Sequence, residues 1–166
     1  MALFLMAISV RPARAGDSDE IGELAGQFAE YLRDLGDETE FKLNAETYLR
    51  DGFGKQPAFS GFVAEDGGNV IGYLLYHLGY DSDSAARNLH VVDLYVEEKA
   101  RRKKAGRALM AAAVEIAVKA EAKELIWSVY NLNSLAASFY EKLGAERITE
   151  IFFMKLRADA LKSGAV

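Results

Sequence analysis

The spacing of apolar residues in the first part of the chain predicts a short strand and two helices. The strand covers residues 8–11, and Asp17 and Glu20 behind it have the spacing of a capping box at a helix start. A second short helix is expected from Asn44 to the Asp51-Gly52 turn. The first helix has its apolar residues at steps of three and four, so that one face belongs to the core. These residues are Ile21, Leu24, Phe28 and Leu32.

A β-hairpin and a further strand are predicted in the middle of the chain. Two apolar, β-forming stretches, residues 61–65 and 70–80, flank the glycine-containing turn at residues 66–69. Residues 89–96 follow a polar turn and are apolar on both faces of a strand. Such a strand is expected in the interior of a sheet, because both of its faces have to be covered.

After Gly106 the apolar pattern changes to a helical period. That helix is followed by a buried strand over residues 124–130, a helix over residues 133–143 and a last strand over residues 148–156. The order β, α, α, β, β, β, α, β, α, β predicts an α/β fold with a mixed sheet. Residues 89–130 should form a right-handed βαβ crossover. We expect a single domain over residues 1–166, since cores usually split only beyond roughly 250 residues.

The composition fits a globular protein and excludes several kinds of chemistry. Of the 166 residues, 51% are hydrophobic and 27% charged, close to average globular usage. The absence of cysteine excludes disulfides, thiolate metal sites and a cysteine nucleophile. No apolar run approaches the roughly 18 residues of a membrane span. The apolar start, residues 1–10, has its first positive charges behind it, unlike a signal peptide. We therefore expect a cytoplasmic protein with no membrane partner.

Positive charge is concentrated in one segment of an acidic chain. The net charge of −5 argues against general nucleic-acid binding, but residues 97–107 carry six Lys or Arg residues against two Glu residues. This segment lies between strand 89–96 and the helix after Gly106, where an open α/β sheet binds ligands and free helix N–H groups attract phosphate. It is a candidate anion site, with a solvated charged surface as the alternative. Its basic residues are Lys99, Arg101, Arg102, Lys103, Lys104 and Arg107.

Part of this segment, Arg101-Arg102-Lys103-Lys104-Ala105-Gly106, resembles the acetyl-CoA pyrophosphate loop of the GNAT superfamily of N-acetyltransferases. The family pattern is Gln/Arg-x-x-Gly-x-Gly/Ala, and Lys104 stands where its first glycine usually lies. A lysine there can still bind phosphate, but it needs an unstrained backbone. The resemblance implies acetyl-CoA as cosubstrate and no metal. The residues expected to bind acetyl-CoA here are Leu94, Tyr95, Val96, Arg101, Arg102, Lys103, Lys104, Ala105, Gly106 and Arg107.

A second stretch, residues 133–145, is similar to the family's Asn-x-x-Ala-x-x-Phe-Tyr-x-x-x-Gly-Phe/Ala helix at every defining position. Asn133, Ala136 and Tyr140 are three and four residues apart, so they share one helical face. The resemblance adds these residues and Ser134 to the acetyl-CoA site. It implies that Tyr140 protonates the departing thiolate; a half-buried tyrosine bonded to a backbone carbonyl is the alternative. It also implies a sheet of six to seven strands flanked by about four helices.

Three shorter stretches resemble the diamine (spermidine/spermine) and thialysine acetyltransferase branch of this superfamily. They are residues 51–57, with a distinctive Asp-Gly-Phe-Gly, residues 80–81 and residues 93–96. The branch often pairs two adjacent acids on the central strand, but here Val92 precedes Asp93. An acid in an apolar strand usually has a task, because burying an unpaired carboxylate is costly. Asp93 is either structural, bonded to backbone or an arginine, or it binds the substrate amine directly or through water.

Tyr31, Asp81 and Glu150 complete the expected substrate site. Tyr31 resembles a substrate-side position of the branch, with core packing as an equal alternative, while Asp81 and Glu150 flank strand ends, where surface acids are common. The two histidines, His77 and His90, alternate with apolar residues in predicted strands. We expect them to be sheet residues and not metal ligands.

Together these features predict acetyl transfer from acetyl-CoA to a primary amine of a small cationic substrate, a polyamine or a lysine-like amino acid. The resemblance implies direct attack in a ternary complex and a homodimer. An amine with a pKa of about 10 is mostly protonated at pH 7, so a base is required; Asp93, through water, is the candidate. The alternatives are acetylation of a protein N-terminus or an antibiotic amine, and a CoA-binding regulatory module without turnover. Nucleic acid is not an expected partner.

Overall fold

The structure, a computed structural model, describes residues 8–162. The chain divides into two compact units, residues 1–133 and residues 134–166. The first holds the sheet and three α-helices, and the second holds two α-helices. The expectation of a single domain stays a prediction.

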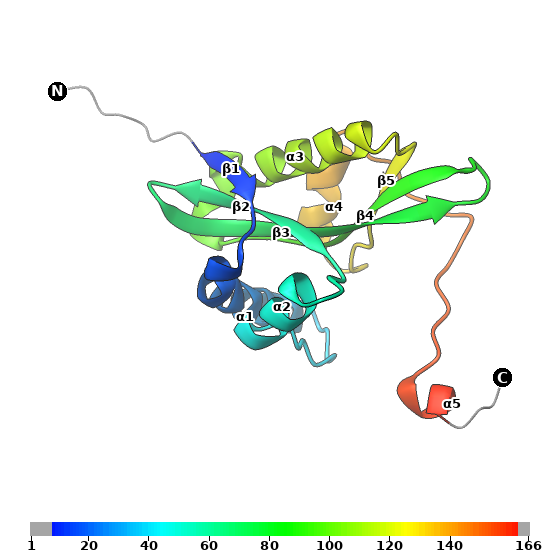
Figure 1. The fold of residues 1–166 in the computed structure, drawn as a ribbon, viewed down its shortest axis with the longest axis horizontal. Helices are drawn as coiled ribbons and strands as arrows, with labels where there is room; N and C mark the ends of the chain where they lie inside the picture. Colours follow the sequence, from blue (N-terminus) through cyan, green and yellow to red (C-terminus); the bar gives the residue numbers. More distant parts are fainter. Residues whose placement is uncertain (1–7, 163–166) are drawn as a thin grey trace. The chain divides into compact units, whose positions relative to one another are not determined.

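The first unit contains one five-stranded mixed sheet (Figure 1). Its strand order is β1-β2-β3-β4-β5, with antiparallel neighbours except for the parallel pair β4 and β5. This confirms the predicted mixed α/β class and the interior position of β4. The strands are β1 (Ser9–Pro12), β2 (Ser60–Asp66), β3 (Asn69–Asp81), β4 (Ala86–Val96) and β5 (Glu124–Ile126).

Helices cover both faces of this sheet. Figure 1 shows α1 (Ser18–Asp34) and α2 (Ala45–Phe53) on one face and α3 (Ala105–Lys119) on the other. The 3-10 helix η1 (Ala15–Asp17) precedes α1, and η2 (Glu98–Lys103) precedes α3. The predicted second helix is confirmed, because Asn44 caps α2 by accepting a hydrogen bond from the backbone N–H of Thr47 at 2.9 Å.

The second unit contains α4 (Ser134–Glu141) and α5 (Ala158–Lys162). The helix predicted over residues 133–143 is confirmed as α4, and Gly144 behind it has a φ of +92°, a conformation that ends helices. The short helix α5 was not predicted.

The expected count of six to seven strands is wrong, since the described residues form five. Residues 148–156, the predicted last strand, have no strand structure, and β5 takes up only Glu124–Ile126 of the predicted stretch 124–130. A strand exists through hydrogen bonds to a neighbour, whereas the sequence pattern reports only which side chains suit one. Ile151, Phe152 and Phe153 are β-forming residues and are nevertheless exposed.

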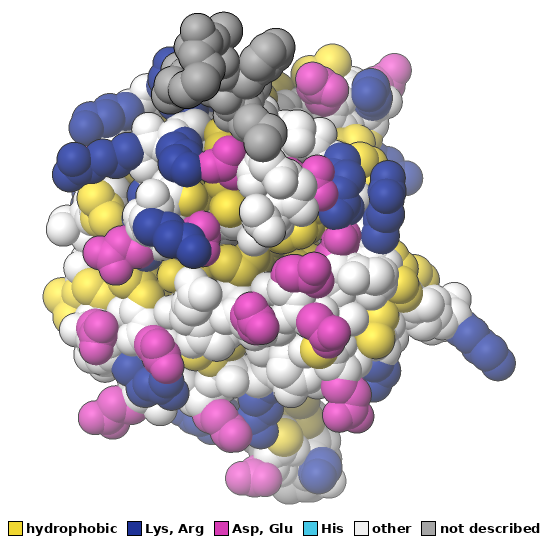
Figure 2. Space-filling view, turned by 90° about the vertical axis from the view of Figure 1, so that its left-hand side faces the viewer, with side chains coloured by type: hydrophobic (Ala, Val, Ile, Leu, Met, Phe, Trp, Pro, Cys, Tyr) yellow, Lys and Arg dark blue, Asp and Glu magenta, His cyan; other side chains and the backbone are white. Residues whose placement is uncertain are grey.

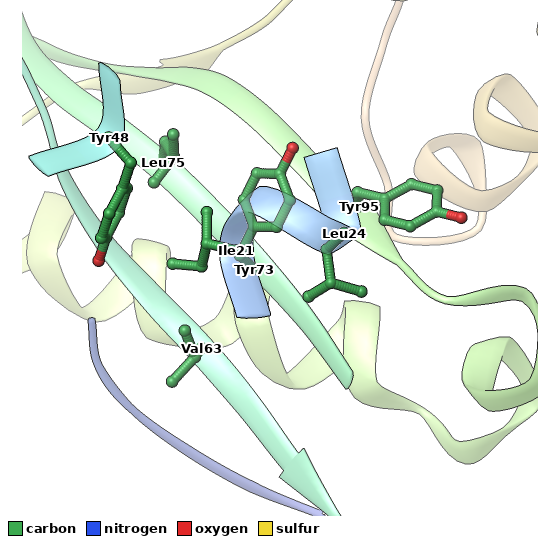
Figure 3. Packing of buried hydrophobic residues seen from close by; sticks show 7 residues of the cluster. All are labelled: Ile21, Leu24, Tyr48, Val63, Tyr73, Leu75 and Tyr95. Carbon is green, nitrogen blue, oxygen red and sulfur yellow. The ribbon is translucent and has the colours of Figure 1, made fainter. Parts of the chain in front are cut away.

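The core of the first unit lies between the sheet and the helices α1 and α2. Ile21 and Leu24 of α1 pack against Tyr73 and Leu75 of β3, as Figure 3 shows. Tyr95 of β4 belongs to the same cluster, along with Tyr48 of α2 and Val63 of β2. The predicted apolar face of α1 is thus confirmed at its first two positions. Aromatic rings in the cluster fix the distance between α1 and the residues on this face of β3 and β4.

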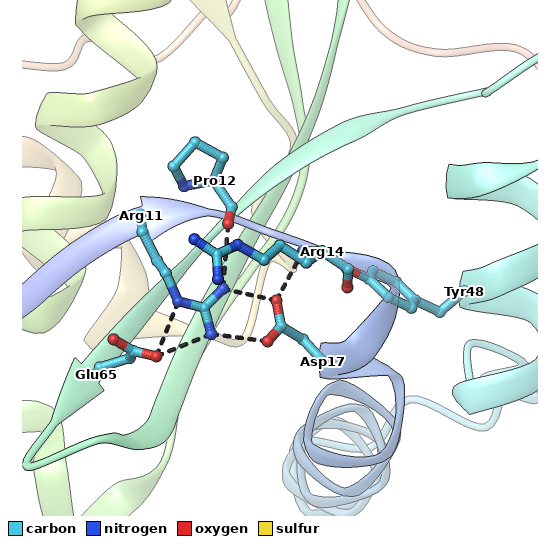
Figure 4. A network of polar contacts seen from close by, with 6 residues as sticks. All are labelled: Arg11, Pro12, Arg14, Asp17, Tyr48 and Glu65. Carbon is cyan, nitrogen blue, oxygen red and sulfur yellow. Dashed lines mark hydrogen bonds and ion pairs between the residues drawn. The ribbon is translucent and has the colours of Figure 1, made fainter.

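A charged network joins β1, β2 and the start of α1 (Figure 4). Both carboxylate oxygens of Asp17 accept hydrogen bonds from Arg11, at 2.9 and 2.7 Å, and Arg11 also bonds to Glu65 at 2.9 Å. Burial acts to raise the pKa of Asp17, but the bonds from Arg11 and from the backbone N–H of Arg14 lower it overall. The predicted capping box of Asp17 with Glu20 is therefore wrong, because Arg11 and Arg14 occupy the carboxylate that would cap α1.

Charge is unevenly distributed over the surface. Figure 2 shows one face, on which Asp and Glu side chains are spread widely while Lys and Arg side chains form groups at the upper left and on the right. No helix within residues 8–162 is both long and apolar enough to cross a membrane. Of the apolar start over residues 1–10, residues 1–7 lie outside the described residues.

Candidate active site

Strand β4 extends beyond the point where its pairing with β5 ends. Among the described residues, β5 pairs with β4 only at positions 88–90, whereas β3 stays paired with β4 on the other side up to Val96. Alternate residues of a strand direct their N–H and C=O groups to opposite sides. Residues 91–96 therefore have backbone N–H and C=O groups on the β5 side that are not hydrogen-bonded to another strand of this sheet. The sheet offers an open row of hydrogen-bonding groups in its interior, at the end of a parallel strand where α/β sheets bind ligands.

A β-bulge in β4 turns Asp93 to the α1 side of the sheet. Leu75 of β3 pairs with Asp93 and Tyr76 pairs with Val91, so Val92 is an extra residue. Leu75 packs in the α1 cluster, so its neighbour Tyr76 points to the other face of the sheet, which α3 covers. Paired residues share a face, so Val91 lies on the α3 side and Asp93 on the α1 side. Strict alternation would place both on one face.

Asp93 is a partly buried acid that accepts hydrogen bonds from two donors. The Tyr73 hydroxyl donates to its Oδ2 at 2.8 Å, and the backbone N–H of Leu94 donates to the same carboxylate. Burial raises the pKa of Asp93 from 3.8 to about 7, even though both hydrogen bonds act to lower it. Near neutral pH the carboxyl is therefore divided between its protonated and ionised forms, as suits a general base. Tyr73 was not among the predicted site residues.

Arg101 of η2 is held against the end of β4. Its Nε donates to the backbone carbonyl of Val96 at 3.3 Å. Its guanidinium lies 4.6 Å from the ring centre of Tyr31 and 5.7 Å from that of Tyr95, within the range of cation–π attraction. Arg101 of the basic segment 97–107 therefore contacts both α1 and β4. It also contributes positive charge to the end of β4.

The rest of the basic segment is divided between anchored and exposed cations. Lys103 forms an ion pair with Asp66 in the turn between β2 and β3, which fixes the loop to the hairpin. Gly106 lies in the first turn of α3, where backbone N–H groups have no partner within the helix. The other basic residues near this turn, Arg102, Lys104 and Arg107, are exposed.

Lys104 has a left-handed backbone, with a φ of +66°, between η2 and α3. Glycine adopts this conformation freely, whereas the Cβ of other residues costs about 1–2 kcal/mol there. The structure therefore does not supply the unstrained backbone that a lysine needs at this position. Lys104 also occupies the N-cap position of α3 without a side-chain capping bond, so its side chain leaves the first N–H groups of α3 uncapped.

Replacing Lys104 with glycine should stabilise the protein. We expect Lys104→Gly to raise the free energy of unfolding by about 0.5–1 kcal/mol, because the relief of strain exceeds the entropic cost of glycine in the unfolded chain. Urea denaturation measures the change. Lys99→Gly, in η2 where the backbone is not left-handed, is the control and should destabilise. A loss of stability in Lys104→Gly would show that the backbone at Lys104 is not strained.

Tyr31 and Asn133 are joined by a hydrogen bond. The Tyr31 hydroxyl donates to Oδ1 of Asn133 at 2.8 Å, and Asn133 is buried. The structure thus brings together a predicted substrate residue, Tyr31, and two predicted acetyl-CoA residues, Asn133 and Arg101. The bond links α1 to the residue just before α4.

The other predicted site residues are placed elsewhere. Asp81 ends β3 and binds the backbone N–H of Ser84 in the β3–β4 turn at 2.9 Å. It is six residues along β3 from Leu75, the partner of Asp93, or about 20 Å at the rise of a strand. In the second unit, Ser134, Ala136 and Tyr140 lie on α4, and Glu150 lies on an exposed stretch without regular structure. The roles of these four residues stay predictions.

The distinctive Asp-Gly-Phe-Gly stretch has a packing role. A Cβ on Gly52 would lie 2.7 Å from the Phe59 ring, so only glycine allows this contact. The ring of Phe53 is 5.2 Å from that of Tyr48. These residues line a hollow of about 420 Å³ between the end of β1, α2 and α3, which includes neither Asp93 nor the basic segment.

His77 and His90 form a cross-strand pair. They face each other on β3 and β4, with His90 Nδ1 3.0 Å from His77 Nε2. Burial and the neighbouring His77 lower the pKa of His90. Among residues 8–162 no group of three or more His, Cys, Asp or Glu side chains is placed to hold a metal ion.

Comparison with known proteins places this arrangement in a class. Residues 24–145 match the model of the acetyltransferase (GNAT) family. Thialysine N-epsilon-acetyltransferase of Bos taurus is 32% identical over 151 residues, covering 86% of each chain. L-ornithine N5-acetyltransferase of Arabidopsis thaliana is 33% identical over 94 residues, covering 57% of this chain and 41% of that protein. An integron cassette protein from the mobile metagenome of V. cholerae shares the fold, with a TM-score of 0.76 at 21% identity over 96% of this chain and 98% of its own.

The two motifs and the mixed sheet are thus those of an acyl-transferring enzyme. The chain belongs to the GNAT family of acetyltransferases, as the sequence resemblance predicted.

Proposed function

We propose that this enzyme transfers the acetyl group of acetyl-CoA to a primary amine of a small cationic substrate, a polyamine or a lysine-like amino acid, by direct attack in a ternary complex. The observation that carries the proposal is Asp93, an acid with a pKa of about 7 placed where β4 separates from β5. A carboxyl group poised near neutral pH inside an apolar sheet is suited to accept a proton from an amine.

The residues around the start of α3 fit acetyl-CoA. GNAT acetyltransferases use this cosubstrate, and its pyrophosphate needs N–H donors and positive charge. The uncapped first turn of α3 provides the donors, and the exposed side chains of Arg102, Lys104 and Arg107 provide charge. Gly106 allows a close approach of the backbone. When bound, acetyl-CoA supplies an activated acetyl thioester.

The open edge of β4 is suited to hold and polarise the thioester. Residues 91–96 have backbone groups that β5 does not take up, and we assign N–H donors of the stretch Leu94 to Val96 to the carbonyl oxygen of the acetyl group. Fixed backbone donors of this kind stabilise the negative charge that develops during acyl transfer. Asn133, Ser134 and Ala136 would complete the binding site for the cosubstrate.

Two proton transfers are required of the protein. The substrate amine is charged at neutral pH, so Asp93, directly or through a water molecule, takes its proton before attack. The thiolate that leaves has to be protonated, and we assign this step to the hydroxyl of Tyr140. Tyr31 contributes to the substrate side through its position next to Arg101 and Asn133.

The names of the relatives support an amine on an aliphatic amino acid as the substrate class. Thialysine and L-ornithine each have a primary amine at the end of a short chain. The net charge of −5 favours attraction of cationic substrates over anionic ones. The homodimer implied by the resemblance remains part of this proposal, and a monomer mass by light scattering at micromolar concentration would contradict it.

Thiol release from acetyl-CoA in the presence of an amine panel tests the proposed function. The panel contains thialysine, lysine, ornithine, spermidine, an aminoglycoside and a peptide with a free N-terminus. We expect kcat/KM to be at least tenfold higher for one of the first four amines than for the last two. Preference for the aminoglycoside or the peptide would overturn the substrate class, and CoA binding without turnover of any amine would overturn the acetyl transfer itself.

A further inference from the structure

Tyr73 is the only side chain that we find bonded to Asp93 in the described residues. It is fully buried on β3, and its hydroxyl donates to Asp93 Oδ2 at 2.8 Å. Its pairing partner on β4 is Tyr95, two residues after Asp93. Because its ring is enclosed by the α1 cluster, the hydroxyl has a fixed position relative to the carboxyl group.

We propose that Tyr73 is a positioning residue for Asp93, which holds one carboxylate oxygen in place and sets the pH range in which Asp93 accepts a proton. This inference rests on the proposed function of Asp93 as base. Tyr73 has no assigned contact with substrate or acetyl-CoA. It acts through the acid, because a hydrogen bond to one oxygen restricts rotation of the carboxyl group and directs the other oxygen away from the tyrosine.

The bond from Tyr73 favours the ionised form of Asp93. A carboxylate is a stronger acceptor than a carboxylic acid, so a fixed O–H donor lowers the pKa of the acid. Burial opposes this effect and is the larger influence on Asp93. Burial and the neighbouring charge of Asp93 raise the pKa of Tyr73 well above 10, so the tyrosine keeps its proton. Tyr73 thus prevents burial from pushing the pKa of Asp93 further above neutrality.

The surroundings contain few other groups that could set this pKa. Of the α1 residues in or against the cluster, Ile21, Leu24 and Phe28 are apolar, and the Tyr31 hydroxyl is bonded to Asn133. The cluster residue of α2, Tyr48, is bonded through its hydroxyl to the Arg14 carbonyl. Across and along the strands the titratable neighbours of Tyr73 are Asp93 and Tyr95, and Arg101 lies over the Tyr95 ring. Burial, Tyr73 and the Leu94 N–H are the causes that act on Asp93.

The test compares Tyr73→Phe with wild-type protein. The acid limb of the kcat/KM profile should move up by roughly one pH unit, because a hydrogen bond to an ionised group has been removed. The same shift is expected for the Asp93 carboxyl carbon in an NMR titration of 13C-aspartate-labelled protein without substrate. Tyr48→Phe is the matched control, since it removes another buried tyrosine hydroxyl, bonded to the Arg14 carbonyl at 2.9 Å, and should leave both midpoints unchanged.

The outcomes separate this inference from the function on which it rests. An unshifted Asp93 midpoint in Tyr73→Phe, or an equal shift in Tyr48→Phe, would overturn the role of Tyr73 whatever the activity. Absence of turnover in wild-type protein would overturn the proposed function instead. If Tyr73→Phe does not fold, the wild-type titration decides, because the Cζ signal of Tyr73 should follow the same midpoint as the Asp93 carboxyl, and an independent midpoint would contradict the inference.

Discussion

Replacing Asp93 with asparagine is expected to lower kcat for amine acetylation by about 10²- to 10⁴-fold at pH 8, the usual contribution of a positioned proton acceptor. Asparagine has nearly the same shape and can still accept the bond from Tyr73, but it cannot take a proton from the amine. Steady-state kinetics with the best amine of the panel measure the loss. Asp83→Asn, in the exposed β3–β4 turn, is the control and should keep wild-type kinetics.

The pH dependence of the same variant distinguishes a lost base from a disturbed fold. Asp93 has a pKa of about 7, so wild-type kcat/KM should fall about tenfold per pH unit below pH 7, as the acid becomes protonated. In Asp93→Asn this limb should disappear from the residual activity. A variant that keeps the limb would show that another group is the base.

Stability provides a second measure of the Asp93 pKa without any substrate. The folded pKa of about 7 lies above the ordinary value of 3.8, so the folded state binds the proton more tightly than the unfolded state. The contribution of Asp93 to the free energy of unfolding should fall by up to about 1.4 kcal/mol per pH unit between pH 4 and pH 7 and level off above that range. Asp93→Asn should lack this contribution, so its stability should increase relative to that of the wild type as the pH rises through that interval.

Tyr140→Phe is expected to lower kcat by about 10²- to 10⁴-fold while changing thermal stability little. Phenylalanine keeps the ring, which lies 5.1 Å from that of Phe139 on α4, and removes the hydroxyl group whose proton we assign to the departing thiolate. Kinetics and a melting temperature are measured on the same protein. Tyr80→Phe, an exposed tyrosine at the end of β3, is the control.

Three results for Tyr140→Phe have different meanings. A large loss of kcat at unchanged stability supports Tyr140 as the proton donor. A loss below about tenfold assigns the proton to water and leaves Tyr140 a residue that positions the thiol. Normal turnover with a stability loss of about 1 kcal/mol, the value of a typical broken hydrogen bond, would make Tyr140 a structural residue.

Local sequence signals predicted the helices and the hairpin well. Asn44 caps α2 because its side chain and the Thr47 backbone are neighbours in the chain, and the turn at residues 66–69 joins β2 and β3 as its glycines indicate. The two motifs predicted the family, which the comparisons confirm. Each of these features depends on residues within a few positions of one another, and such patterns are legible in a single sequence.

Features that depend on distant partners were not predictable. The extra residue Val92 is defined only by the register of β4 against β3, so alternation along β4 could not show which face Asp93 takes. Tyr73 looks like an ordinary core residue of a strand until that register places it by the acid. Arg11 displaced the expected capping box because it is brought to Asp17 by the pairing of β1 with β2. In each case strand pairing set the position of the side chain, and a single sequence does not show that pairing.

The bulge at Val92 divides β4 into two stretches that can vary independently. Before it, Leu89 and Val91 are fully or nearly fully buried, and substitutions there should chiefly affect folding. After it, Asp93 faces the opposite side of the sheet, and its substitution should chiefly affect chemistry, whereas Tyr95 in the same stretch belongs to the core. Because one inserted residue separates the two, the acid can be exchanged for another side chain without repacking the α3 side. The chemistry at position 93 can therefore change while Leu89 and Val91 keep their packing on the α3 side.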